Sequence, residues 1–231
     1  MIYLILMIVT MIFGLIAQAS VRRTFKKYNT VPTKSGLTGE QAARKIIQMN
    51  NLDVRVEGTH GELTDHYDPR NNTLRLSEST MHNNSIAAIG VAAHEAGHAI
   101  QDGVNYFPNK LRAALVPVAN IGSRSGPYLA FIGIMINAYA SRGNFGITVA
   151  YIGLFLYLFA VLFYFVTLPV EFNASNRAIT ILNDTDMLDA GELKGAKKVL
   201  RAAAMTYVAS AASALVSLLR LVSIVNNSNR R

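Results

Sequence analysis

The sequence predicts an α-helical membrane bundle that carries a small α+β unit. Of the 231 residues, 51% are hydrophobic and only 16% are charged, a composition that indicates a membrane protein. Two long runs, at 2–17 and 145–168, contain no charged residue, and the second is long enough to cross a bilayer as a helix. Residues 30–110 are polar in character, which predicts a compact unit outside the membrane.

We expect residues 1–20 to form a transmembrane helix that is retained in the mature protein. The apolar run at 2–17 is followed by four basic residues, Arg22, Arg23, Lys26 and Lys27. A secretory signal peptide carries its positive charges before the apolar run, so this segment does not have the pattern of a cleaved signal. Because basic residues are retained on the cytoplasmic side, residue 22 onward is predicted to lie in the cytoplasm.

Residues 21–110 are predicted to form the α+β unit. Thr38 with Gln41 three residues later indicates the capped start of an amphipathic helix. The alternating stretch 52–58 predicts one strand, and 62–78 predicts two strands joined by the turn DPRNN. We expect a short antiparallel sheet beside a helix that begins after Ser85 and ends near Asp102 and Gly103.

The rest of the chain is predicted to form three segments: a transmembrane hairpin over 111–168, a helix with a basic cytoplasmic stretch over 169–201, and a C-terminal transmembrane helix with a tail over 202–231. The connection SRGN inside the hairpin is short and carries one basic residue, Arg142. The basic residues at 22–27 and 194–201 outnumber it, which again places the α+β unit on the cytoplasmic side.

The stretch HEAGH at 94–98 predicts a metal site on the helix that follows Ser85. Residues four apart lie on one face of an α-helix, so His94 and His98 can place two imidazoles on one ion. Glu95 lies about 100° round the helix and can reach a water activated by the metal. This arrangement predicts a zinc-dependent hydrolase with Glu95 as general base. The chain has no cysteine, so cysteine-ligated zinc is excluded.

A zinc site with one open position needs a third protein ligand. The candidates are His60, His66, His82, Glu171 and Glu192. A metzincin would carry a histidine six residues after His98, but position 104 is valine, so that class is excluded. Glu171 follows Pro169, which suits the first turn of a helix. Two predicted membrane crossings between His98 and Glu171 would return the chain to the same side, which favours Glu171.

The segments AAHEAGHAIQ at 92–101, LPVEFNASNRA at 168–178 and DHYDPRNNTLRLSE at 65–78 resemble the YugP-like membrane zinc metallopeptidases, a bacterial family, over nearly the whole chain. The resemblance implies a zincin-like catalytic unit of the gluzincin type, with His94, His98 and Glu171 holding one zinc ion. Wider relatives carry an E-x-x-A-D motif. Here the aspartate is replaced by Ser175, which leaves open how one ligand histidine is oriented.

Further polar residues near these motifs have several possible roles. Asn173 and Arg177 could hold a substrate carbonyl or an oxyanion, His82 could do the same, and surface or structural roles are the alternatives. The stretch 72–78 could offer a strand edge to an extended peptide.

The function that these observations predict is a membrane zinc metalloendopeptidase acting on a peptide or protein substrate, in contact with the lipid bilayer of a bacterial cell membrane. The alternatives are a zinc-binding membrane scaffold or chaperone cofactor without turnover, and a metal-coordinating transporter. The net charge of +8 arises beside apolar runs, so no nucleic-acid partner is expected.

Overall fold

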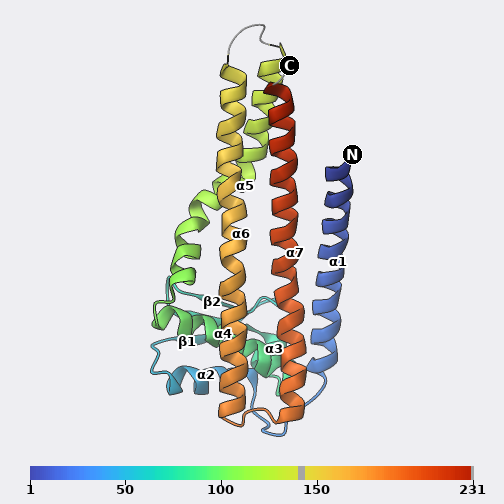
Figure 1. Ribbon diagram of the computed structural model, residues 1–231. Helices are drawn as coiled ribbons and strands as arrows, with labels where there is room; N and C mark the ends of the chain where they lie inside the picture. The colour runs from blue at the N-terminus through green and yellow to red at the C-terminus, as the bar shows by residue number, and fades with distance from the viewer. Residues whose placement is uncertain (140–143, 230–231) are drawn as a thin grey trace. The chain divides into compact units, whose positions relative to one another are not determined.

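The computed structural model describes residues 1–139 and 144–229, and most of them are helical (Figure 1). The long helices are α1 (Ile2–Asn29), α5 (Phe107–Tyr139), α6 (Phe145–Asp184) and α7 (Ala190–Asn229). The shorter elements are α2 (Gly39–Met49), β1 (Arg55–Thr59), β2 (His66–Asp68), β3 (Thr73–Ser77), α3 (Glu78–Met81) and α4 (Ile86–Gly103). Arg142, with most of the predicted SRGN connection, and the final Arg230 and Arg231 lie outside the described residues.

Among the described residues, three helices are long and apolar enough to cross a membrane: α1, α6 and α7. Helix α5, the predicted first half of the transmembrane hairpin, is not one of the three. It carries Arg112 and Arg124 and contains two internal prolines, Pro117 and Pro127. That α5 crosses the membrane therefore stays a prediction. The number of membrane crossings between His98 and Glu171 stays a prediction as well.

The chain divides into two compact units. One consists of residues 1–15, 110–168 and 207–231, and the other of residues 16–109 and 169–206. Every predicted site residue belongs to the second, which we call the site unit. It contains the sheet, helices α2, α3 and α4, and parts of the long helices α1, α6 and α7.

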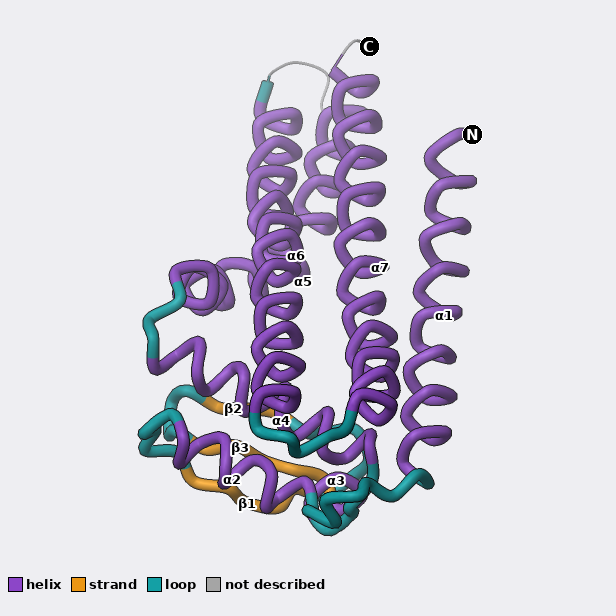
Figure 2. The backbone as a smooth tube through the Cα atoms, turned by 60° about the horizontal axis from the view of Figure 1, so that its bottom comes forward, coloured by secondary structure: helices purple, strands orange, loops and turns teal. Residues whose placement is uncertain are grey.

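The sheet of the site unit is mixed, with strand order β1-β3-β2 (Figure 2). β1 runs parallel to β3, whereas β2 runs antiparallel to it. The prediction of an antiparallel sheet was therefore wrong for β1, because alternation identifies a strand but not its partner. Leu74 and Leu76 of β3 have no exposed surface, so the most buried strand takes the centre. Both edges of β3 are paired, which contradicts the idea that 72–78 offers a free edge.

The predicted helix starts of the site unit are confirmed. Thr38 and Gln41 form a reciprocal capping box at α2, in which the Gln41 N–H donates to Thr38 Oγ1 and the Thr38 N–H donates to Gln41 Oε1. At α4 the Ala88 N–H donates to Ser85 Oγ over 3.1 Å. The helix ends at Gly103, as expected.

Helix α4 lies at the centre of the site unit and packs against α2, β2 and β3. The residues of its apolar positions are small, and Ala92, Ala93 and Ala96 have no exposed surface. Small residues at these positions allow neighbouring backbones to come close to the helix, and this proximity brings the side chains of the site together.

Helix α6 runs without interruption through Pro169, so the prediction that a new helix begins there was wrong. An internal proline removes a backbone donor and costs about 3 kcal/mol in a helix. Val170, Ala174 and Ala178 follow it and are all fully buried in the site unit. The packing of this face offsets the cost and keeps Glu171 in register with the rest of α6.

Candidate metal centre

Three nitrogen and oxygen donors meet between α4 and α6 in the site unit. Glu171 Oε2 lies 3.3 Å from His94 Nε2 and 3.6 Å from His98 Nε2. Among the described residues, these three side chains form a group whose donor atoms all lie within 4.8 Å of one another. All three side chains are largely buried, with Glu171 only 5% exposed. The structure thus brings together the three residues that the sequence singled out as ligands.

The two carboxylate-to-imidazole distances fit a tetrahedral zinc site. Zinc binds imidazole nitrogen and carboxylate oxygen at roughly 2.0–2.2 Å, so two donors at the corners of a tetrahedron lie about 3.4 Å apart. The carboxylate-to-imidazole distances of 3.3 and 3.6 Å bracket that value. Two imidazoles and one carboxylate also form a donor set that catalytic zinc sites use, with the fourth position left open.

A close approach of the two helices makes this spacing possible. An added Cβ at Gly97 would lie 2.7 Å from the carbonyl oxygen of Ala174, so only glycine fits at this point of α4. Gly97 lies between the two histidines in sequence, and Ala174 follows Glu171 by one helical turn. The contact between Gly97 and Ala174 therefore sets the distance between the two histidines and the carboxylate of Glu171.

Each imidazole has its second ring nitrogen in contact with another polar group. His94 Nδ1 lies 3.1 Å from Ser175 Oγ, and His98 Nδ1 lies 3.0 Å from Gln101 Oε1. Both Nδ1 atoms are engaged, which leaves both Nε2 atoms facing Glu171 as potential ligands. Ser175, four residues after Glu171 on α6, thus contacts the face of the His94 ring that lies away from Glu171.

Glu95 is buried at 9% exposure next to this group. Burial raises the pKa of Glu95 to about 7, and the carboxylates of Glu171 and Asp65 add to the rise. His94 and a hydrogen bond from the backbone N–H of Tyr67 act in the opposite direction. A carboxyl group that titrates near neutral pH is suited to accepting a proton and returning it.

The alternative third ligands lie elsewhere. His60, His66 and His82 are exposed and do not belong to the His94, His98 and Glu171 group. Glu192 is the third residue of α7 and forms a capping box with the N-cap residue Asp189: its carboxylate accepts from the backbone N–H groups of Lys34 at 2.7 Å and Asp189 at 2.8 Å. The pattern Asp-x-x-Glu at 189–192 is a capping-box signal that the sequence analysis did not use.

Asn173 and Arg177, predicted as possible substrate contacts, hydrogen-bond to each other. Arg177 Nε donates to Asn173 Oδ1 over 2.8 Å, and Gln101 Nε2 donates to the same oxygen over 3.0 Å. Gln101 was missed by the sequence analysis. The signal was present, because Gln101 follows His98 by three residues and His94 by seven, and therefore lies on the same helix face.

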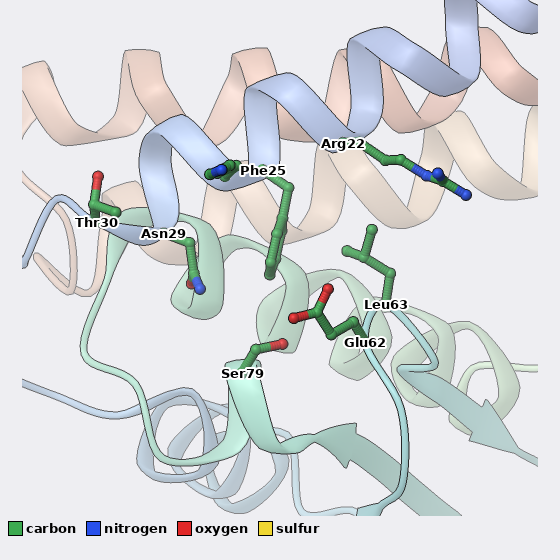
Figure 3. A pocket seen from close by; sticks show the side chains of 8 residues that line it. Arg22, Phe25, Asn29, Thr30, Glu62, Leu63 and Ser79 are labelled. Carbon is green, nitrogen blue, oxygen red and sulfur yellow. The ribbon is translucent and has the colours of Figure 1, made fainter.

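A separate cavity of about 760 Å³ lies in the site unit between α1 and the loop that joins β1 to β2 (Figure 3). Its lining consists of Arg22, Phe25, Lys26, Asn29, Thr30, Glu62, Leu63 and Ser79. None of these residues is a predicted ligand or base. Two basic residues and one acidic residue contribute to the lining, so its charge does not select one class of ligand.

Fold and site together define a mostly helical protein with apolar helices that could span a membrane and a buried group able to hold a metal ion. The chain belongs to the family described as "Putative neutral zinc metallopeptidase", whose model matches residues 3–226. It is also 42% identical over 228 residues to the "Putative membrane protease YugP" of Bacillus subtilis (strain 168), covering 98% of each chain. No solved structure matches the chain. The resemblance found in the sequence is confirmed, and zinc is the metal that the family description implies.

Proposed function

We propose that the protein is a membrane zinc metalloendopeptidase with a zincin-like catalytic unit of the gluzincin type, in which His94, His98 and Glu171 hold one zinc ion. The observation that supports this most is the spacing of the three donors, 3.3 and 3.6 Å from the carboxylate to the two imidazoles. Membership of a zinc metallopeptidase family and the name of the B. subtilis relative point the same way.

Zinc, when bound, supplies a Lewis acid that polarises a peptide carbonyl and makes water a stronger nucleophile at neutral pH. Glu95 is the general base in this proposal: its buried carboxylate accepts the proton of the attacking water and then transfers it to the leaving amine. The Tyr67 N–H holds this carboxylate in place. Ser175 and Gln101 orient the imidazoles of His94 and His98 through their Nδ1 atoms.

The substrate in this proposal is an extended peptide that pairs with the outer edge of β2. β3 is excluded because β1 and β2 occupy both of its edges. β2 packs against α4, and its Tyr67 N–H hydrogen-bonds to Glu95, so this edge faces the proposed base and the peptide must pair with the other backbone groups of the edge. An added strand would bring its own backbone carbonyls beside the catalytic groups.

The test compares peptide hydrolysis and zinc content in the same purified samples of wild type, His94→Ala, Glu171→Ala and Glu95→Gln. General-base catalysis contributes about 10²–10⁴-fold, so Glu95→Gln should lose at least about 10²-fold in rate and keep its zinc. His94→Ala and Glu171→Ala should lose both. Wild-type hydrolysis by Glu95→Gln would refute the mechanism, and zinc without any wild-type turnover would favour the scaffold alternative.

We place the site unit on the cytoplasmic side of the bacterial membrane. The support is the charge pattern, with basic residues at 22–27 and 194–201 against the single Arg142 of the SRGN connection. Topology reporters fused at residue 60 and at residue 143 should report opposite sides, with residue 60 in the cytoplasm. A reporter at residue 60 found outside the cell would overturn the orientation and leave the proposed chemistry intact.

A further inference from the structure

We propose that Gln101 is a positioning residue that fixes the tautomer of His98 for metal binding, and that Asn173 and Arg177 hold Gln101 in the required orientation. The inference rests on the proposed function, because it concerns how one of the proposed zinc ligands is presented. It assigns to Asn173 and Arg177 a role other than contact with the substrate.

The contact between Gln101 and His98 is sealed from solvent. Gln101 Oε1 lies 3.0 Å from His98 Nδ1, and Gln101 has no exposed surface. Water therefore cannot reach the Gln101 amide to take the place of His98. A buried polar group left without its hydrogen bond costs about 1–3 kcal/mol, so both groups are held to this arrangement.

The orientation of the Gln101 amide follows from its other partners. Gln101 Nε2 lies 2.8 Å from the backbone carbonyl oxygen of Val170. A carbonyl oxygen can only accept, so the amide group facing it must be the NH₂. The amide oxygen of Gln101 then faces His98 and can only accept, which requires the proton of the imidazole to be on Nδ1.

Asn173 and Arg177 reinforce this orientation. Arg177 Nε can only donate, so the atom of Asn173 that lies 2.8 Å from it is the amide oxygen. The same oxygen accepts from Gln101 Nε2 over 3.0 Å. Every hydrogen bond from Arg177 through Asn173 and Gln101 to His98 thus has one possible direction.

The consequence is that a neutral His98 ring carries its lone pair on Nε2, on the side of Glu171. The other histidine lacks this constraint. Its Nδ1 contacts Ser175 Oγ, and a hydroxyl can donate as well as accept, so Ser175 orients the His94 ring without fixing its tautomer. His98 is therefore the pre-organised ligand of the pair, and Gln101 is the residue that makes it so.

The experiment measures zinc affinity of the full-length protein in detergent by competition with a chromophoric chelator. The variant is Gln101→Met, which keeps length and removes both hydrogen-bonding groups. Gln48→Met, an exposed glutamine of α2, is the matched control. Loss of a residue that orients a metal ligand lowers affinity about 10–100-fold, which is the expectation for Gln101→Met.

A second readout is the tautomer itself, recorded from the imidazole ¹⁵N signals of histidine-labelled, chelator-treated protein. Wild type should show an Nδ1-protonated ring that is absent from His98→Ala, distinct from that of His66, whose Nδ1 lies 2.8 Å from the Thr64 carbonyl oxygen. Gln101→Met should lose the His98 signal. Unchanged affinity or an unchanged tautomer in Gln101→Met overturns the proposal. His98→Ala separates the two hypotheses: if it binds zinc like wild type, the proposed ligand set fails, whereas the tautomer measurement still decides the role of Gln101.

Discussion

Replacing Gly97 by alanine should weaken zinc binding although it alters no ligand. The new Cβ would lie 2.7 Å from the carbonyl oxygen of Ala174 and 3.3 Å from its carbonyl carbon. Carbon-to-oxygen contacts between packed backbones are about 3.3–3.6 Å. To lengthen the contact of 2.7 Å to at least about 3.3 Å, helices α4 and α6 must separate by roughly 0.6 Å or more at this point.

The magnitude of the effect follows from the tolerance of a metal site. Ligand distances are held to within about 0.2 Å, so a separation about three times larger removes Glu171 from the reach of an ion held by the histidines. Overpacking of this kind costs about 1–3 kcal/mol, which the site can relieve only by letting the helices move apart. Because 1.4 kcal/mol corresponds to a factor of ten, zinc affinity should fall about 10–100-fold.

The assay is chelator competition on purified Gly97→Ala, with Gly14→Ala as the matched control. Gly14 also lies inside a helix, but an added Cβ there meets nothing within 4 Å. Gly14→Ala should bind zinc like wild type, and it reports the gain of about 0.5–1 kcal/mol in helix stability that the exchange brings by itself. Wild-type affinity in Gly97→Ala would refute the argument that this contact sets the ligand spacing.

Three further predictions concern the residues around the site. In chelator-treated protein, the pKa of Glu95 of about 7 lies above the usual 4.5, so stability should fall by at most about 3 kcal/mol as pH rises from 4.5 to 7 and should level off above it. Thermal melts of wild type and Glu95→Gln should differ in this slope, and equal slopes would contradict the burial argument. Ser175→Ala removes the contact with His94 Nδ1 and should lower zinc affinity up to about tenfold, as measured by chelator competition. Glu192→Ala leaves the Asp189 cap in place but removes the acceptor of the Lys34 and Asp189 N–H groups, and should cost about 1–2 kcal/mol in stability. Zinc affinity should be unchanged, whereas a loss of zinc would make Glu192 a ligand.

The elements whose signals are local could be predicted from the sequence. The capping box of Thr38 and Gln41, the Ser85 cap and the end of α4 at Gly103 each depend on a few neighbouring residues, and each is present. Long-range relations were predicted less well. The partner of β1 depends on which strand is most buried, and alternation of residues does not reveal this. The continuity of α6 through Pro169 depends on packing against α4, which a proline in the sequence does not reveal.

The site shows the same division. The spacing of His94 and His98 follows from helix geometry alone, whereas the choice of Glu171 depended on the predicted membrane crossings and on the resemblance of 168–178 to a known family. Gln101 was missed because it lies outside the HEAGH motif, although a buried polar residue on the histidine face is a physical signal in its own right. The partners of Asn173 and Arg177 could not be predicted, since hydrogen bonds between helices depend on the tertiary fold.

Two facing helices supply every group of the proposed centre, and this has a consequence for how its parts interact. From α4 come the histidines, the Gly97 contact and Gln101, and from α6 come Glu171, the Val170 carbonyl and Ser175. A change in the distance between the two helices therefore changes both the ligand spacing and the orientation of both imidazoles. When two residues both depend on the same helix spacing, the effects of their substitutions on free energy are not additive and differ from the sum by about 0.5–3 kcal/mol. Once Gly97→Ala has moved α6 away, the Val170 carbonyl no longer holds Gln101, so adding Gln101→Met should cost less zinc affinity than it does in the wild type. Full additivity in this double-mutant cycle would mean that helix spacing and tautomer are controlled separately.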